Sequence, residues 1–285
     1  MTELQPIVAS APFATHDPFD RKAFAALYPQ VAGTFAHELA SNPLFAWDRL
    51  AQIVDQGDEG MMQVRETLPD GRFEPIARMP ASKASLVEGL PQTQNWIMLR
   101  DLDRWPDFAP LVADIHAAIG SVAQPRTGEL LLPTAYLFLS SPGLLTPLHF
   151  DPEFNILFHI AGDKNFTVLR DEAGVPNARD NEVFHKDGDN LIGWQDRFSE
   201  QGETFPLKPG DALHVPFKAA HYVGVGDAPS ISLSVTWRSR DSLLQDDAWA
   251  MNAWMRRRGL APRPIGQSFR AKGNAMRALR RLRLA

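Results

Sequence analysis

The chain has 285 residues, contains no cysteine and carries a formal net charge of −5 at pH 7. This length fits one large domain or two small ones, and a composition of 44% hydrophobic and 22% charged residues is typical of a globular protein rather than a disordered one. The lack of cysteine excludes disulfides, thiolate metal sites and a cysteine nucleophile, and it fits a reducing compartment, so we expect a cytoplasmic protein.

Residues 1–127 are expected to form a mostly helical region whose strands extend a following barrel. The first twelve residues lack a basic segment followed by an apolar run, so we expect no secretory signal. Asn42 followed by Pro43 predicts a helix start, because an amide side chain can cap a helix and proline is tolerated in its first turn. Helices are expected over residues 21–55, 82–90 and 105–119, and strands over residues 61–66 and 95–99.

Residues 128–240 change to short β segments separated by turns. The most apolar window, residues 130–150, is broken by three prolines and a glycine, so it cannot be a membrane helix and is expected to form two strands around a turn. Ala161-Gly162-Asp163 is typical of a hairpin turn. Eight candidate strands cover residues 129–132, 135–140, 154–160, 165–170, 204–207, 212–215, 221–225 and 231–237. This density of short strands favours a sandwich or a small barrel.

Residues 241–285 return to helical patterns, with a break at residues 259–264. Residues 248–285 contain ten lysines or arginines and no acid, whereas the rest of the chain has 19 basic and 34 acidic residues. A basic segment can bind nucleic acid, an anionic membrane surface or an acidic partner. No nucleic-acid-binding motif accompanies this one, so we favour basic helices that pack on an acidic body. Apolar residues on these helices favour a homodimer: Trp249, Trp254, Met255, Phe269, Met276, Leu279 and Leu282.

His149 and Asp151 are the first candidates for chemistry. On an extended chain, residues two apart point to the same side, so this pair brings an imidazole and a carboxylate to one point. A third ligand must come from elsewhere, and His221 is the best candidate because it begins a strand shortly after a Pro-Gly-Asp turn. Two histidines and one carboxylate on one face of a metal leave three positions open, which is typical of non-haem Fe(II) oxygenases. Closed structural zinc sites use four protein ligands instead.

Three further histidines lie in or near the same β-rich region. His214 is an alternative third ligand, but Pro216 closes its strand and His221 follows that turn, which favours His221. His159 has the strand phase of Asp151, and we expect a hydrogen-bonded core histidine there. His185 lies in a polar stretch and is expected to be exposed.

Several motifs of residues 128–237 occur together in a known family. They are the run from Thr146 to Asp151, Asn155, the Gly162-Asp163-Lys164 turn, the Pro209-Gly210-Asp211 turn before His221 and the late strand at 231–237. In these motifs the chain resembles the cupin-like branch of the JmjC oxygenases, with a pattern near that of the asparaginyl hydroxylase that represses hypoxia-inducible factor. The resemblance implies a mainly β fold, the double-stranded β-helix (a jelly-roll or cupin-like barrel), as a catalytic core over residues 128–240. An N-terminal helical region precedes this core and C-terminal helices follow it.

The resemblance also implies Fe(II) as the metal and 2-oxoglutarate as the co-substrate. It makes His149, Asp151 and His221 the iron ligands. The same resemblance assigns Lys164 to the distal carboxylate of 2-oxoglutarate, Thr146 to a hydrogen bond with it and Asn155 to the wall of its pocket. Tyr136 is a candidate for the pocket tyrosine of the family, and it fits a core aromatic equally well.

The implied reaction is hydroxylation of a peptide or protein side chain, or of a small molecule. Demethylation shares its first step and is not separated from it by the motif. A cupin-type enzyme with another metal is an alternative, although such sites more often use His-x-His and Glu, which position 151 does not offer. A non-catalytic barrel with a regulatory or nucleic-acid-binding role, and a hydroxylase of sugars or polysaccharides, are two further alternatives.

Two other segments are candidates for substrate binding. Residues 171–202 are long, charged and rich in turns, and we expect a lid or a substrate-binding wall, with a decorative loop as the alternative. Arg238 and Arg240 follow the last strand, where solvated surface is favoured over an anion-binding role.

Overall fold

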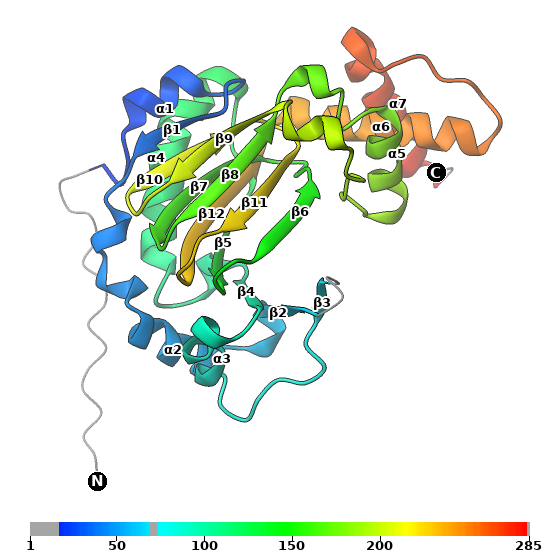
Figure 1. Ribbon diagram of the computed structural model, residues 1–285. Coiled ribbons are helices and arrows are strands. Elements are labelled where there is room, and N and C mark those ends of the chain that lie inside the picture. Colours follow the sequence, from blue (N-terminus) through cyan, green and yellow to red (C-terminus); the bar gives the residue numbers. More distant parts are fainter. Residues whose placement is uncertain (1–16, 69–72, 284–285) are drawn as a thin grey trace.

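The computed structural model describes residues 17–68 and 73–283, so the first twelve residues, where no signal is expected, lie outside the described part of the chain. Within it, two antiparallel β-sheets face each other, with helices around them (Figure 1). The larger sheet has the order β1 (Gly33–Ala36), β10 (Asp211–Val215), β7 (Phe154–Ala161), β12 (Ser230–Arg238), β5 (Leu131–Ser140), β4 (Asn95–Leu99), β2 (Met62–Thr67) and β3 (Phe73–Pro75). The smaller sheet has the order β6 (Leu145–His149), β11 (His221–Val225), β8 (Lys164–Leu169) and β9 (Gly202–Leu207).

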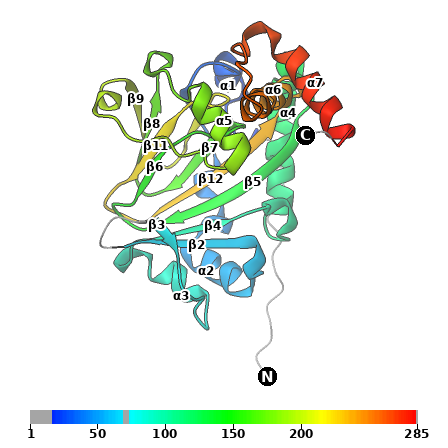
Figure 2. The same cartoon turned by 90° about the vertical axis from the view of Figure 1, so that its right-hand side faces the viewer.

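Seven α-helices are found in the described ranges. They are α1 (Arg21–Leu27), α2 (Trp47–Gln56), α3 (Ala84–Glu88), α4 (Ala109–Thr127), α5 (Ala178–Asp187), α6 (Arg240–Arg257) and α7 (Phe269–Arg281). Helix α4 lies along the face of the larger sheet that is turned away from the smaller one (Figure 2). None of these helices is long and apolar enough to span a membrane.

Strand β12 shows how the two faces of the larger sheet differ. Its apolar residues from Ile231 to Trp237 alternate with two serines and a threonine, and they join the core that includes Leu111 and Ile115 of α4. Its serines point the other way, into the space between the sheets, where Ser232 meets Lys164 of β8. A second apolar core, which includes Leu157 and Phe166, lies between the sheets as well. The predicted mainly β, cupin-like double-stranded β-helix is therefore confirmed.

The Ala161-Gly162-Asp163 turn is not the hairpin that its sequence predicts. Strand β7 before it belongs to the larger sheet and β8 after it to the smaller sheet, so the turn carries the chain across the barrel. Gly162 has a φ of +76°, and a Cβ there would lie 2.5 Å from the carbonyl oxygen of Pro229. Glycine is required for both reasons, and local turn chemistry is the same whether a turn joins paired strands or separate sheets.

The boundaries of several other strands and of helix α2 differ from the predictions. The strands expected at 129–132 and 135–140 form one strand, β5, which carries an irregularity where Leu132 adopts a φ of +49°. Asn42 caps a short 3-10 turn, Pro43–Phe45, and the helix α2 begins only at Trp47. The helical prediction for residues 21–55 is wrong at β1, and β3 was not predicted, because strands of four and three residues are too short to show a period.

Basic residues of α7 pair with acids of the neighbouring C-terminal helix α6. Arg277 and Arg280 both contact Asp247 of α6 at 2.5 Å, and Arg270 contacts Asp241 at 2.6 Å. Helix α7 approaches α6 closely at Gly273, where a Cβ would lie 2.5 Å from a backbone oxygen of α6. These ion pairs join the two C-terminal helices to each other, whereas Arg256 of α6 contacts Glu182 of α5 at 2.7 Å. The packing of basic helices on an acidic body stays a prediction. The boundaries of the three regions at 127/128 and 240/241 stay a prediction.

Candidate metal centre

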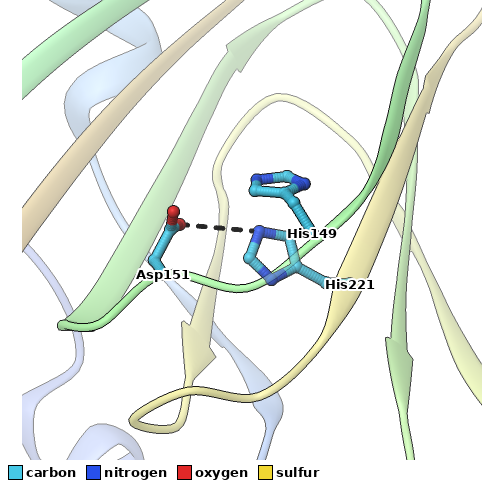
Figure 3. A group of neighbouring side chains, drawn as sticks. All are labelled: His149, Asp151 and His221. Carbon is cyan, nitrogen blue, oxygen red and sulfur yellow. Dashed lines mark ion pairs between the residues drawn. The ribbon is translucent and has the colours of Figure 1, made fainter. Parts of the chain in front are cut away.

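His149 and His221 come together because β6 and β11 pair in register at these two residues. Their ring centroids are 4.2 Å apart. Asp151 lies two residues beyond the end of β6, and its Oδ2 is 3.6 Å from His221 Nε2 (Figure 3). One ligand atom from each of the three residues lies within 4.8 Å of the others. The structure thus brings together the three side chains that the sequence selects.

The two imidazoles are oriented by the backbone in the same way. His149 Nδ1 lies 2.8 Å from the carbonyl oxygen of Pro147, and His221 Nδ1 lies 2.9 Å from that of Ala219. A carbonyl only accepts, so each Nδ1 donates its hydrogen and each neutral ring keeps its lone pair on Nε2. Metal-bound histidines are commonly fixed in this manner. The donor set, with one carboxylate and two Nε2 atoms, fits a divalent metal such as Fe(II).

His221 is available as a ligand at neutral pH. Burial lowers its pKa to about 4, with a further contribution from the neighbouring His149, while Asp151 acts in the opposite direction. Phe166 of β8 stacks on its ring at a centroid distance of 4.8 Å and an angle of 20°. The Asp151 side chain is 31% exposed, whereas His221 is 3% exposed, so the group opens to solvent on the Asp151 side.

Thr146 reaches the side of His149 through an irregularity in β6. His149 pairs with His221 and Thr146 pairs with Val223, so three steps along β6 match two steps along β11. The additional residue makes a β-bulge, and it reverses the phase that regular alternation would give. Because paired residues share a side, Thr146 lies on the side of His149.

Lys164 is buried in the space between the sheets. It lies two residues before Phe166 on β8, so both side chains point to the side of His221. Its Nζ donates to Ser232 Oγ at 2.8 Å, and no described carboxylate lies within ion-pairing distance of it. Burial lowers the pKa of Lys164 to about 7. A buried ammonium without a counter-charge is costly, so this position fits the carboxylate of a bound anion.

Asn155 and Tyr136 lie on the same inner surface of the larger sheet. Asn155 accepts a hydrogen bond from Ser234 at 2.8 Å, and Tyr136 is paired with Ser234 across β5 and β12. Tyr136 also stacks on Phe138 at 6.2 Å. Burial raises the pKa of Tyr136, and nearby carboxylates, including Asp151, add to this effect. Tyr136 thus has both an aromatic neighbour and a position near the three candidate ligands.

The three other histidines that the sequence analysis discussed lie apart from His149, Asp151 and His221. His214 packs against Phe24 and Tyr28 and bonds the carbonyl oxygen of Val31 at 2.9 Å, which agrees with the choice of His221. His159 is fully buried and hydrogen-bonded, as expected. The prediction for His185 is wrong: its side chain is only 12% exposed and lies 3.5 Å from Asp246, because α5 packs on α6.

A buried charge network around the mouth of the barrel was not predicted. Lys218 Nζ lies 2.8 Å from Asp246 of α6, and its backbone amide donates to the carbonyl oxygen of Asp151 at 3.2 Å. Arg238 contacts Asp246 and, at 3.0 Å, Glu153, so its expected solvated position is wrong. These residues lie far apart in the sequence, and charged side chains of this kind are usually exposed. No sequence pattern therefore predicted that they are buried together.

Residues 171–202 form more than a loop. They contain α5, which begins with a capping box of Asn177 and Asp180. Further on, Ile192 donates to the carbonyl oxygen of Leu148 at 2.9 Å and Phe150 donates to that of Asn190 at 3.2 Å. This segment therefore lies along the strand that carries His149, where a wall beside the candidate site was expected.

No protein-family model matches the chain. Over 113 residues it is 31% identical to "Jumonji C domain-containing protein 5" of Drosophila melanogaster, a match that covers 35% of this chain and 26% of that protein. The chain thus spans about a quarter of that relative. YcfD of Escherichia coli has a similar structure, with a TM-score of 0.51 at 14% identity over 92% of this chain and 68% of the other.

A second YcfD structure is described as a ribosomal oxygenase in complex with cobalt and 2-oxoglutarate. It gives a TM-score of 0.50 at 14% identity, over 90% of this chain and 65% of the other. These comparisons confirm the fold and the likeness to JmjC proteins. The narrower likeness to the asparaginyl hydroxylase stays a prediction.

Proposed function

We propose that the protein is an Fe(II)- and 2-oxoglutarate-dependent oxygenase that hydroxylates a side chain of a peptide or protein. The observation that carries this proposal is the group of His149, Asp151 and His221, whose ligand atoms lie within 4.8 Å of one another at the open end of a cupin-like barrel. Two histidines and one carboxylate leave coordination positions for a co-substrate and dioxygen. The cobalt and 2-oxoglutarate in the similar YcfD structure support the same pairing of metal and co-substrate.

The residues around the group have distinct roles in this proposal. Lys164 pairs with the distal carboxylate of 2-oxoglutarate, and Thr146 donates a hydrogen bond to it. Asn155 and Tyr136 line the pocket on the side of the larger sheet. No described acid pairs with Lys164, which supports this role for the lysine, because the bound anion then supplies the missing counter-charge.

When bound, iron and 2-oxoglutarate supply the oxidative chemistry, in which 2-oxoglutarate and dioxygen give succinate, carbon dioxide and a hydroxylated product. The protein supplies orientation. The carbonyl groups of Pro147 and Ala219 hold both imidazoles with Nε2 toward the metal, and Lys164 fixes the far end of the co-substrate. Buried apolar side chains such as Phe166 and Leu157 keep water from the interior of the barrel.

An anaerobic titration with Fe(II) and 2-oxoglutarate tests the proposal through the weak visible absorption band of the chelate. The wild-type protein should develop this band, and His149→Ala and Asp151→Ala should lose it. His116→Gln on α4 is a matched control, because it changes a histidine outside the group, and it should keep the band. A wild-type protein that binds neither partner would contradict the proposal and favour a non-catalytic barrel.

A protein substrate is favoured by the description of YcfD as a ribosomal oxygenase. A screen for succinate release should therefore respond to peptides, including peptides from ribosomal proteins, more strongly than to metabolites or glycans. Stimulation by glycans alone would favour the polysaccharide alternative, and release of formaldehyde would indicate demethylation.

We also propose a cellular location and an oligomeric state for the protein. The cysteine-free sequence supports a cytoplasmic location. A homodimer through α6 and α7 stays a prediction, for which the exposed Leu282 at the end of α7 is one contact candidate. Light scattering that gives a monomer, with and without residues 242–285, would exclude it.

A further inference from the structure

We infer that His159 and Ser232 are positioning residues that fix the Lys164 ammonium toward the distal carboxylate of the co-substrate. This inference rests on the proposed function and deepens it. The three residues form a continuous hydrogen-bonded chain from the turn at Gly162 into the space between the sheets. Each of their side chains is at least nine-tenths buried, with exposed fractions of 0% for His159, 0% for Ser232 and 6% for Lys164.

The hydrogen positions in this chain follow from its acceptors. His159 Nε2 lies 2.8 Å from the carbonyl oxygen of Gly162, so it carries the hydrogen and donates it. Burial, together with the charge of Lys164, lowers the pKa of His159 to about 4, so its ring is neutral at pH 7 and Nδ1 holds a lone pair. Ser232 Oγ lies 3.1 Å from this Nδ1 and donates its single hydrogen to it.

Ser232 is thereby left as an acceptor toward Lys164. Its Oγ lies 2.8 Å from Lys164 Nζ, which donates one of its three hydrogens. The other two N–H groups are available for a carboxylate, and no described acid competes for them. Without His159 the Ser232 hydrogen is free to rotate toward the ammonium, and the lysine loses its fixed partner. We expect the co-substrate to bind less tightly for this reason.

The hydrogen-bonded series of Gly162, His159, Ser232 and Lys164 begins at a turn that is specific to this fold. The Gly162 carbonyl that receives the His159 hydrogen belongs to the turn that carries the chain from β7 to β8, and Lys164 begins β8 two residues later. The same turn thus sets the backbone position of Lys164 and, through His159 and Ser232, the direction of its side chain. A second histidine, His37, bonds the carbonyl oxygen of His159 at 2.9 Å and holds the backbone of β7 in place.

The test is the dissociation constant of 2-oxoglutarate on anaerobic Fe(II)-loaded protein, read from the visible band. His159→Leu, which has no polar atoms, should weaken binding about three- to tenfold, the effect of one hydrogen bond. Ser232→Ala should weaken it by at least as much. His159→Gln keeps a donor and an acceptor and should restore binding to near the wild-type value. Metal affinity, measured without 2-oxoglutarate, should be the same in all three variants.

A double variant separates positioning from a general structural role. If His159 acts through Ser232, then His159→Leu should add no further loss in the Ser232→Ala background. Additive losses, or normal binding by His159→Leu, would overturn the inference. If His159→Leu does not fold, Ser232→Ala and His159→Gln still decide it, because they predict loss and retention of affinity.

Failure of the proposed function gives a different result. At 2-oxoglutarate concentrations that give the visible band in the wild-type protein, Lys164→Met should show no band, while the metal still binds. If the wild-type protein forms no band, the proposed function and this inference are both overturned. If Lys164→Met behaves as expected and His159→Leu and Ser232→Ala bind like the wild type, only the inference is overturned.

Discussion

His149 and His221 face each other across two paired strands, and each donates its Nδ1 hydrogen to the carbonyl group two residues before it. The two Nε2 atoms, which are the candidate metal-binding nitrogens, are therefore oriented by the backbone alone. Such a site should gain stability from the metal by mass action, without a change of fold.

Cobalt(II), which does not redox-cycle as readily as iron, should raise the melting temperature of the protein. At 100 times the dissociation constant the stabilisation should be about 2.7 kcal/mol. A chelator should reverse it, and His149→Ala should show none of it. Calorimetry with and without metal measures the effect, and His116→Gln should respond like the wild type. Equal stabilisation of His149→Ala would place the metal elsewhere.

Phe166→Leu should weaken metal binding about tenfold, because the ring that stacks on His221 no longer restrains it. The loss of stability should be about 1 kcal/mol, since the change is nearly conservative in volume. Phe205→Leu is the matched control: Phe205 pairs with Phe166 in the same core and does not stack on a ligand. It should cost similar stability and leave metal affinity as it was, as competition with a fluorescent chelator can show.

Lys164→Met should stabilise the protein at pH 7 by ~2 kcal/mol or more, because it removes a buried charge. The unfolded chain keeps its Lys164 proton up to the ordinary pKa of 10.5, whereas the folded protein releases it near 7. Between these values the unfolded state binds more protons, so wild-type stability should rise with pH. Urea unfolding from pH 6 to 10 should show this rise only where Lys164 is present.

A lysine on the surface provides the control for that experiment. Lys208 is 64% exposed and pairs with Asp163, so Lys208→Met should leave the pH dependence unchanged. A Lys164→Met variant that is less stable than the wild type at pH 7 would contradict the assignment of a buried charge without a counter-charge.

Asp246→Asn should destabilise the protein by about 3–5 kcal/mol, because Lys218 and Arg238 lose their shared counter-charge while still buried. Burial alone would raise the pKa of Asp246, but His185, Lys218 and Arg238 together lower it to about 2. The contribution of Asp246 to stability is therefore present above the unfolded pKa of 3.8 and is lost as the pH falls toward 2. Acid unfolding monitored by circular dichroism should show a weaker acid dependence in the variant.

Asp241 is a matched control on the same helix. Its ion pair with Arg270 is largely exposed, so Asp241→Asn should cost less than about 1 kcal/mol. Similar losses of stability in the two variants would show that the buried network around Asp246 stabilises the protein no more than an exposed ion pair does.

The local motif around His149 was predictable from the sequence because its spacing is short and its strand is marked by turns. His221 was predictable because a Pro-Gly-Asp turn lies shortly before its strand in the sequence. The side on which Thr146 lies was not, because regular alternation places it opposite His149 and only the bulge in β6 corrects this. A bulge depends on the partner strand, which a single sequence does not reveal.

The contacts of the charged mouth were also beyond sequence reasoning. Lys218, Arg238 and Asp246 belong to a loop, a strand end and a helix, and only the packing of α6 on the barrel buries them together. The crossing turn at Gly162 has the same limitation, since the pairing of distant strands decides which sheet each neighbour joins.

Strand β6 is the outer strand of the smaller sheet, yet it offers little to an incoming chain. Residues 190–192 occupy its backbone groups next to the candidate metal ligands, and Pro147 has no amide hydrogen to give. This edge is therefore protected against aggregation by strand addition. A polypeptide that approaches this edge therefore cannot add to the sheet as a strand beside His149, because residues 190–192 already hold these backbone groups.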